Sequence, residues 1–226
     1  MDEASKTNAI REEGFADRFL GGRVLDIGAG QDQVCDWAEI FDQQHGDANE
    51  IDRYFEPGTF DTVHSSHSLE HMINPEKVLS KWWSLVKPGG YLIIVVPDED
   101  LYEQGIWPSF FSPDHKSTFR LDKKESWSPV SYEIRSLCQA LQNAEIISAQ
   151  VHDTNYVYSL RFPEGITPKR VKQPLKLLLS MAKRIPVVGA NVKLNILRRL
   201  VTWGYPFDQT LGNSLAQIQI IVHKQQ

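Results

Sequence analysis

The sequence predicts an α/β protein with an open, mostly parallel sheet that helices cover on both faces. Short apolar runs alternate along the chain with segments of helical spacing. These runs are continuous, which is typical of parallel strands buried on both faces. With 226 residues, 41% hydrophobic and 23% charged, the chain suits one domain with a real core, and it is too apolar for a disordered or fibrous protein.

The expected strands are apolar runs that end at turn residues. We expect them at residues 23–27, 37–41, 60–64, 91–96, 146–151 and 215–222, after an N-terminal helix or arm in residues 1–20. Ligands of such a sheet bind at the carboxyl ends of its strands.

Two helices between these strands have clear start signals. Asn74 can cap the first, Pro75 suits its first position, and apolar residues follow at helical spacing. Ser128 and Pro129 give the same signal for a second helix.

Three features of the sequence indicate the cellular compartment of the protein. The longest clean apolar run, Leu92 to Val96, is far shorter than the roughly 20 residues of a membrane span. Residues 1–13 are polar and do not resemble a secretory signal, and the two cysteines form no disulfide framework. We therefore expect a cytoplasmic protein, with peripheral contact at the inner membrane surface as an open alternative.

The net charge of −5 is unevenly distributed. Residues 163–205 hold nine Lys and Arg and one acid, a net +8, so the rest of the chain carries −5 − 8 = −13. We interpret this segment as an inserted basic helical hairpin, a lid or docking segment within a single 1–226 domain. Its basic face is either solvated or meets an anionic acceptor or membrane surface. No recognised nucleic-acid-binding module accompanies it, so we expect no nucleic acid partner.

Four blocks in order carry a family resemblance. They are Val24-Leu25-Asp26-Ile27-Gly28-Ala29-Gly30, Gly46-Asp47-Ala48-Asn49, residues 60–71 ending in Leu69-Glu70-His71, and Val86-Lys87-Pro88-Gly89-Gly90-Tyr91-Leu92. Together they resemble the class I S-adenosylmethionine-dependent methyltransferases. The resemblance implies a Rossmann-like fold with an antiparallel C-terminal strand, and S-adenosylmethionine as cofactor.

The resemblance also implies which residues contact this cofactor. They are Asp26, Gly28, Ala29 and Gly30 in the glycine loop, Asp47 and Ala48 against the adenine, Ser65 and Ser66 after the strand at 60–64, and a ribose-binding acid. Only eleven residues separate Gly30 from Asp42, barely enough for a parallel crossover. We choose Asp42 as the ribose acid, with Glu39 in reserve. We expect the pocket to be more open on this side or covered by another part of the chain.

The catalytic candidates are acids and histidines expected on the acceptor side. A hydroxyl acceptor needs a general base, and histidine or a carboxylate suits that role. We select His67 and His71 after the strand at 60–64, and Asp98, Asp114 and His115 in the connection after the strand at 91–96. The alternatives are that His71 is a packing residue and that Asp114-His115 is a polar turn.

The connection after the strand at 91–96 allows two further interpretations. Asp98, Glu99 and Asp100 could bind a metal with His115, but their contiguity matches no recognised motif, so we expect no metal. The aromatic residues there form either a satellite core or a wall for the acceptor (Tyr102, Trp107, Phe110, Phe111 and Trp127).

The sequence thus predicts methyl transfer to a hydroxyl or amine of a small molecule or glycan. Bacterial relatives with such sequences often accompany cell-envelope polysaccharide synthesis. The alternative is a methyltransferase-like protein that binds a cofactor or partner without catalysis. Gln33 replaces the third glycine of a dinucleotide-binding loop, which argues against a nicotinamide oxidoreductase.

Overall fold

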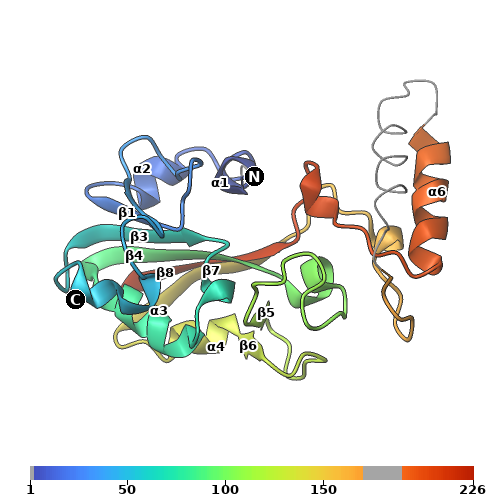
Figure 1. The fold of residues 1–226 in the computed structure, drawn as a ribbon. Coiled ribbons are helices and arrows are strands. Elements are labelled where there is room, and N and C mark those ends of the chain that lie inside the picture. Colours follow the sequence, from blue (N-terminus) through green and yellow to red (C-terminus); the bar gives the residue numbers. More distant parts are fainter. Residues whose placement is uncertain (1–2, 170–189) are drawn as a thin grey trace.

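The computed structural model describes residues 3–169 and 190–226, and Figure 1 shows how their helices and strands are arranged. Six strands form the main sheet in the order β2-β1-β3-β4-β8-β7. Their bounds are β1 Val24–Ile27, β2 Glu39–Phe41, β3 Phe60–Ser66, β4 Val86–Pro97, β7 Ala144–His152 and β8 Gln217–Lys224. The first four are parallel, and β8 is antiparallel to both β4 and β7. The predicted mostly parallel sheet with an antiparallel C-terminal strand is confirmed.

Helices cover both faces of this sheet, as predicted (Figure 1). The α-helices are α1 Glu3–Asn8, α2 Phe15–Phe19, α3 Pro75–Ser84, α4 Ile134–Gln139 and α6 Ala190–Thr202, and the short helical turns are η1 Ala48–Arg53, η2 Leu69–His71, η3 Glu99–Glu103, η4 Tyr158–Leu160 and η5 Gln209–Leu211. On one face, Phe15 and Phe19 of α2 pack on Val24 and Ile93. On the other face, Trp82 of α3 and residues of α4 join the larger core.

The crossover from β1 to β2 is short and contains no helix. The two strands are nevertheless parallel, with Leu25 opposite Glu39. The N-terminal segment packs against this connection, because Asn8 Nδ2 donates to the Val34 carbonyl at 2.9 Å and Val34 joins the α2 core. The N-terminal segment therefore covers the sheet where a crossover helix would lie.

One helix start was predicted correctly and one was wrong. Asn74 Oδ1 accepts from Lys77 N at 3.1 Å, and Pro75 opens α3. The helix expected at Ser128 instead begins at Ile134 and is capped by Glu133. Residues in between form strand β6 (Ser131–Glu133), which pairs in parallel with β5 (Thr118–Arg120). Backbone pairing in this small second sheet outweighs the local cap signal.

The basic segment is described only in part. Residues 170–189 lie outside the described residues, including the predicted first helix and its turn. The second helix is α6, which lies beyond the end of the main sheet (Figure 1). In α6, the side chain of Ile196 is 48% exposed, whereas Val201 packs against Ile106 and Phe162.

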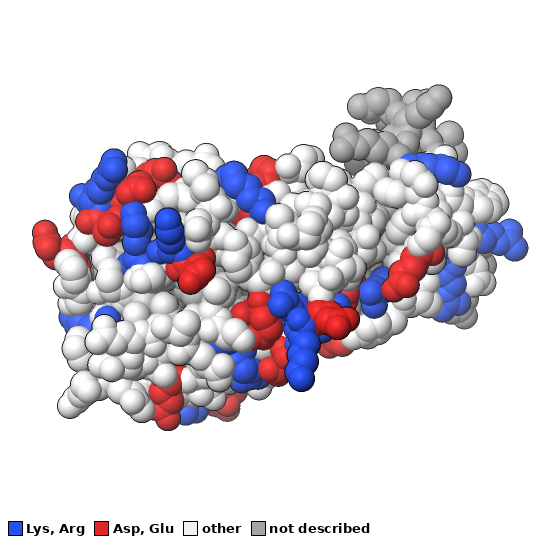
Figure 2. Space-filling view, turned by 90° about the horizontal axis from the view of Figure 1, so that it is seen from below, with Lys and Arg blue, Asp and Glu red and all other residues white. Residues whose placement is uncertain are grey.

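Acidic and basic side chains are interspersed over the face shown in Figure 2. Pairs such as Lys123 with Asp100, at 2.9 Å, account for part of this mixing. The acidic excess of the main body is therefore not gathered into one patch on this face. No helix in the described ranges is long and apolar enough to cross a membrane.

Candidate active site

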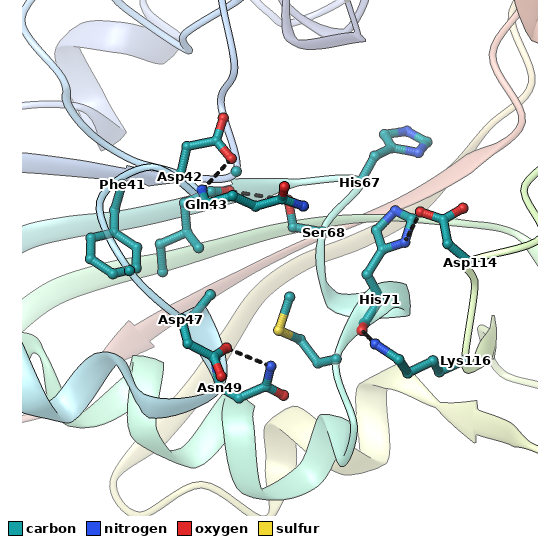
Figure 3. A pocket seen from close by; sticks show the side chains of 15 residues that line it. Phe41, Asp42, Gln43, Asp47, Asn49, His67, Ser68, His71, Asp114 and Lys116 are labelled. Carbon is teal, nitrogen blue, oxygen red and sulfur yellow. Dashed lines mark hydrogen bonds and ion pairs between the residues drawn. The ribbon is translucent and has the colours of Figure 1, made fainter.

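A cavity of about 630 Å³ lies at the carboxyl ends of β1, β2 and β3 (Figure 3). Its lining comes from the loop after β1, the turn after β2, the start of η1, the segment after β3 and a distant loop near residue 115 (Ile27, Gly28, Phe41, Asp42, Gln43, Gly46, Asp47, Ala48, Asn49, His67, Ser68, His71, Met72, Asp114 and Lys116). This volume lies within the range of small-molecule sites, roughly 300–1,000 Å³.

Gly28 allows the backbone to pass close to this cavity. It has a φ of +76°, and a Cβ there would lie 1.9 Å from Ser68 Oγ. Its N–H donates to the Phe41 carbonyl at 2.8 Å, which ties the glycine loop to the end of β2. Only glycine fits both the left-handed conformation and the close approach of Ser68.

Asp42 is the acid that follows β2, and it lines the cavity. Its Oδ2 accepts from Gly30 N at 3.0 Å and its Oδ1 accepts from Gln43 N at 2.7 Å. Each carboxylate oxygen has a second lone pair, so the group retains acceptor capacity for a ligand. Glu39 is not part of the lining and pairs with Arg23 at 2.5 Å.

Asp47 caps η1 at the same end of the cavity. Its Oδ1 accepts from Asn49 Nδ2 at 2.8 Å and from Asn49 N at 2.9 Å, and these hydrogen bonds lower the pKa of the Asp47 carboxyl. Helix α3 holds the Ala48 backbone in place, because Trp82 Nε1 donates to the Ala48 carbonyl at 2.9 Å. Helix α3 therefore positions the η1 part of the lining.

The opposite end of the cavity carries histidines. His71 Nδ1 lies 3.0 Å from Asp114 Oδ2, and the His71 carbonyl accepts from Lys116 Nζ (Figure 3). His67 Nε2 lies 3.0 Å from Gln217 Oε1. Two segments far apart in the sequence, η2 and the loop near residue 115, thus meet at one end of the site.

The buried carboxylate of Glu70 lies close to these histidines. Glu70 is 1% exposed, and neither oxygen of its carboxylate has a hydrogen-bond partner among the described residues. Its Oε1 lies 3.7 Å from His67 Nδ1, 3.8 Å from His71 Nε2 and 3.9 Å from His115 Nε2. The Glu70 side chain is therefore surrounded by three imidazoles without bonding to any of them.

His115 is held on its other side by a second buried acid. Its Nδ1 lies 2.6 Å from Glu103 Oε1, and the ring stacks on Tyr102 with 5.4 Å between centroids. Burial works to lower the pKa of His115, but the hydrogen bond to Glu103 and the negative charges of Glu70 and Asp114 outweigh it, so the pKa is raised. Glu70 belongs to the Leu69-Glu70-His71 block of the family resemblance but was not predicted as a site residue. No sequence signal indicated Glu103.

The glycine loop, the acids after β2 and the histidines after β3 agree with a comparison of the sequence with known families. A family model described as a methyltransferase domain matches residues 5–147, which is more than half of the chain. The chain belongs to this methyltransferase family. Residues 148–226, with the basic segment, lie outside the match.

Solved structures of methyltransferases have the same fold. An S-adenosylmethionine-dependent methyltransferase from Archaeoglobus fulgidus is 16% identical, covers 99% of this chain and 95% of its own, and has a TM-score of 0.50. A chain in the Haloferax volcanii complex of the Trm112 methyltransferase activator with a methyltransferase is 13% identical, covers 100% and 91%, and has a TM-score of 0.51. The predicted class I S-adenosylmethionine-dependent methyltransferase is confirmed in family and fold.

A curated sequence relative is much larger than this methyltransferase. A highly reducing polyketide synthase of Emericella nidulans is 35% identical over 65 residues, which are 28% of this chain and 3% of the synthase. The match therefore concerns a short stretch of a long protein.

Several predicted cofactor residues lie outside the lining of the methyltransferase cavity. Asp26 is 1% exposed, with Oδ1 2.7 Å from His64 Nδ1 and Oδ2 accepting from Val34 N at 2.7 Å. Its carboxylate thus serves the packing between β1, β3 and the following loop. The remaining four also lie outside the lining, although Gly30 N binds Asp42 and Ser65 Oγ donates to the Ile27 carbonyl (Ala29, Gly30, Ser65 and Ser66).

The structure does not place Asp98 in the cavity. Its Oδ1 accepts from Asp100 N at 2.9 Å and from Leu101 N at 3.0 Å, so it caps η3. Nor do the three acids after β4 converge on His115: Glu99 bonds to Lys123 and Ser131 instead. The metal arrangement considered from the sequence is therefore absent.

We expect Asp98→Asn to stabilise the methyltransferase at neutral pH and not at pH 4. Burial, with the charges of Asp100 and Glu99, raises the pKa of Asp98 to about 6, so the folded state holds this proton more tightly than the unfolded state. The contribution of Asp98 to wild-type stability then falls as the pH rises from about 4 to 6 and is level above. Asparagine caps equally well and does not ionise, so its advantage reaches up to about 3 kcal/mol.

Urea unfolding of both proteins between pH 4 and 8 measures this difference. Asp208→Asn is the control, because Asp208 caps η5 in the same way from a partly exposed position. A difference between wild type and Asp98→Asn that does not change with pH would contradict the prediction.

Three of the five predicted aromatic residues after β4 join satellite cores. Tyr102 and Phe111 pack with Tyr156, and Phe110 packs with the cluster of Ile106 and Phe162. None of the predicted aromatic residues lines the cavity. The described parts of the basic segment, 163–169 and 190–205, contribute no lining residue either, which argues against a lid role for those parts.

Proposed function

We propose that this methyltransferase transfers the methyl group of S-adenosylmethionine to a hydroxyl or amine of a small molecule or glycan. One observation carries the proposal: a single cavity has acids at one end, histidines at the other, and a glycine turn between them. The acidic end suits the nucleoside of the cofactor, and the histidine end suits a protic acceptor.

The acidic end fits the cofactor in its chemistry. Asp42 retains lone pairs for ribose hydroxyls, and Asp47 with Ala48 would lie against the adenine. Gly28 leaves room for the amino acid part, because no side chain can stand at that position. When bound, the cofactor supplies a methyl group that its sulfonium has already activated.

The protein has to align the acceptor and take up its proton. A hydroxyl that stays protonated is a poor nucleophile near neutral pH. With Nδ1 of His71 directed at Asp114, the Nε2 atom carries the lone pair that can assist deprotonation. The Lys116 ammonium, which donates to the His71 carbonyl, favours an acceptor that bears negative charge. This histidine end supports catalysis over binding alone.

The nine cations of the basic segment support a docking role outside the cavity. We propose contact with an anionic acceptor or an anionic membrane surface, since a net +8 over residues 163–205 attracts both. Cell-envelope glycan synthesis is consistent with such an acceptor.

We expect Asp42→Ala to weaken S-adenosylhomocysteine binding about 10- to 100-fold, measured by isothermal titration calorimetry. Without the Asp42 carboxylate, the ribose hydroxyls would lose two charge-assisted hydrogen bonds, each worth about 1.5–3 kcal/mol before compensation. Glu39→Ala is the matched control, because it removes an acid from the same strand that does not line the cavity.

Three outcomes of this titration are decisive. Weakening in Asp42→Ala alone supports the ribose assignment. Weakening in Glu39→Ala alone reverses it. If the wild type binds neither S-adenosylmethionine nor S-adenosylhomocysteine, the proposed function is wrong.

A further inference from the structure

Glu70, His71 and His115 bring their ligand atoms together, and we call them the histidine–glutamate cluster. One nitrogen or oxygen from each lies within 4.8 Å of the others. Glu70 Oε1 is 3.8 Å from His71 Nε2 and 3.9 Å from His115 Nε2, too far for hydrogen bonds. Two ligands of a tetrahedral metal ion, each 2.0–2.2 Å from it, are about 3.4 Å apart. To hold an ion, the two Glu70–histidine distances need to shorten by roughly half an ångström, and the distance between the two histidine nitrogens, at most 4.8 Å, by up to about 1.4 Å.

The Glu70 carboxylate is unsatisfied without such an ion. It is 1% exposed, and both of its oxygens lack a hydrogen-bond partner among the residues described. A buried carboxylate is costly unless it is paired or coordinates a metal. A cation at the cluster would supply the missing partner.

Both histidines are oriented as metal ligands usually are. His71 directs Nδ1 at Asp114 at 3.0 Å, and His115 directs Nδ1 at Glu103 at 2.6 Å. In metal sites such carboxylates fix the ring and leave the other nitrogen free to coordinate. Here the free Nε2 atoms face Glu70. Glu70, Glu103 and Asp114 carry a combined charge of −3 when ionised, and a divalent cation would offset most of it.

We propose that Glu70, His71 and His115 bind a divalent transition-metal ion of the Zn²⁺ type. Two imidazoles and one carboxylate favour such an ion over Mg²⁺ or Ca²⁺, which prefer oxygen ligands. Three protein ligands leave a coordination position open, and His71 places the cluster at the edge of the cavity (Figure 3).

The role of the ion rests on the proposed function. With the ion bound, His71 Nε2 would coordinate it, and the ion would then take over the part of the His71 lone pair in assisting deprotonation. An acceptor hydroxyl at the open position would have its pKa lowered, so that it loses its proton more readily to the surrounding solvent or a neighbouring base. The binding of the ion depends only on the three side chains and stands apart from the acceptor.

Metal binding is tested on full-length protein that has been stripped with a chelator and then freed of it. We expect one Zn²⁺ per chain in calorimetric titration, no binding of Mg²⁺, and a visible absorption band when Co²⁺ is added. Glu70→Gln, His71→Ala and His115→Gln are each expected to weaken Zn²⁺ binding at least about 100-fold. Glu103→Gln, which removes only the group behind His115, should weaken it about 10- to 100-fold.

Controls separate this cluster from adventitious metal binding. His223→Ala and Glu145→Gln change a histidine and an acid that pair elsewhere, and they should bind Zn²⁺ as the wild type does. His71 is partly exposed, so its alanine variant disturbs folding least, and circular dichroism confirms that each variant is folded. Absence of Zn²⁺ and Co²⁺ binding in the wild type, or wild-type affinity in all three folded cluster variants, would overturn the proposal.

Titration with S-adenosylhomocysteine distinguishes this proposal from the proposed function. Metal binding without S-adenosylhomocysteine binding contradicts the proposed function and leaves the metal site supported. The reverse result contradicts the metal site alone.

Discussion

Trp82→Ala is expected to lower the free energy of unfolding by about 3–5 kcal/mol. The Trp82 side chain is fully buried in the larger core between α3 and the sheet, so its removal leaves a cavity that the surrounding residues cannot fill. It also leaves the Ala48 carbonyl without its indole donor. Urea denaturation followed by circular dichroism measures the loss.

A phenylalanine pair separates the effect on the core from the effect on the site. Trp82→Phe removes the hydrogen bond to Ala48, which lines the cavity, and Trp83→Phe removes an equivalent 2.9 Å bond to the Gln142 carbonyl, which does not. Each should cost about 1–3 kcal/mol of stability. Only Trp82→Phe should weaken S-adenosylhomocysteine binding, by about tenfold. Equal weakening in both variants would show that α3 does not position the η1 part of the lining.

Asp26→Ala is expected to destabilise the protein by about 3–5 kcal/mol. Asp26 and His64 are both buried and lie 2.7 Å apart, and Arg11 donates to His64 Nε2 at 3.2 Å and to Gln219 Oε1 at 2.8 Å. Without the carboxylate, the imidazole and the Val34 N–H lose their acceptor, and the partly buried Arg11 loses its nearby counter-charge. Breaking a buried charged network in this way is strongly destabilising.

Two further variants define the origin of this loss. Asp26→Asn keeps one acceptor oxygen and should cost less, about 1–2 kcal/mol. Asp32→Ala is the control, because Asp32 is a more exposed acid of the same loop whose carboxylate bonds only to Ser5 among the described residues. Both are measured by urea denaturation. If Asp26→Ala and Asp32→Ala are equally stable, the buried network does not hold the N-terminal segment to the sheet.

Local signals in the sequence predicted the elements whose stabilising groups are close together in the chain. The cap and first residue of α3 are Asn74 and Pro75, and the capping bond spans only three residues. The apolar run at 91–96 likewise predicted the second half of β4. The helix expected at Ser128 failed because residues 131–133 pair with β5, a partner that no local pattern encodes.

Both ends of the cavity contain part of the residue set that the sequence predicted, including His67, His71 and Asp114 at the histidine end. The lining contains Gly28, Asp42, Asp47 and Ala48, because glycines and acids that follow parallel strands lie at one edge of the sheet. Asp26 lies outside the lining for a related reason. Successive side chains of a strand point to opposite faces, so its carboxylate faces α2, whereas Ile27 faces the cavity side.

Residues 23–96 alone were sufficient for the family, the parallel core and the acid after β2, since short-range spacing and strand order set these features. The sequence did not reveal that Glu70 meets His115, or that His115 is backed by Glu103, although the quoted Leu69-Glu70-His71 block contained the first acid. That arrangement depends on how the loop after η3 folds back over η2, where Lys116 N and Ser117 N both donate to the Glu70 carbonyl. Long-range packing brings these charged groups together against their desolvation cost, and no local propensity encodes it.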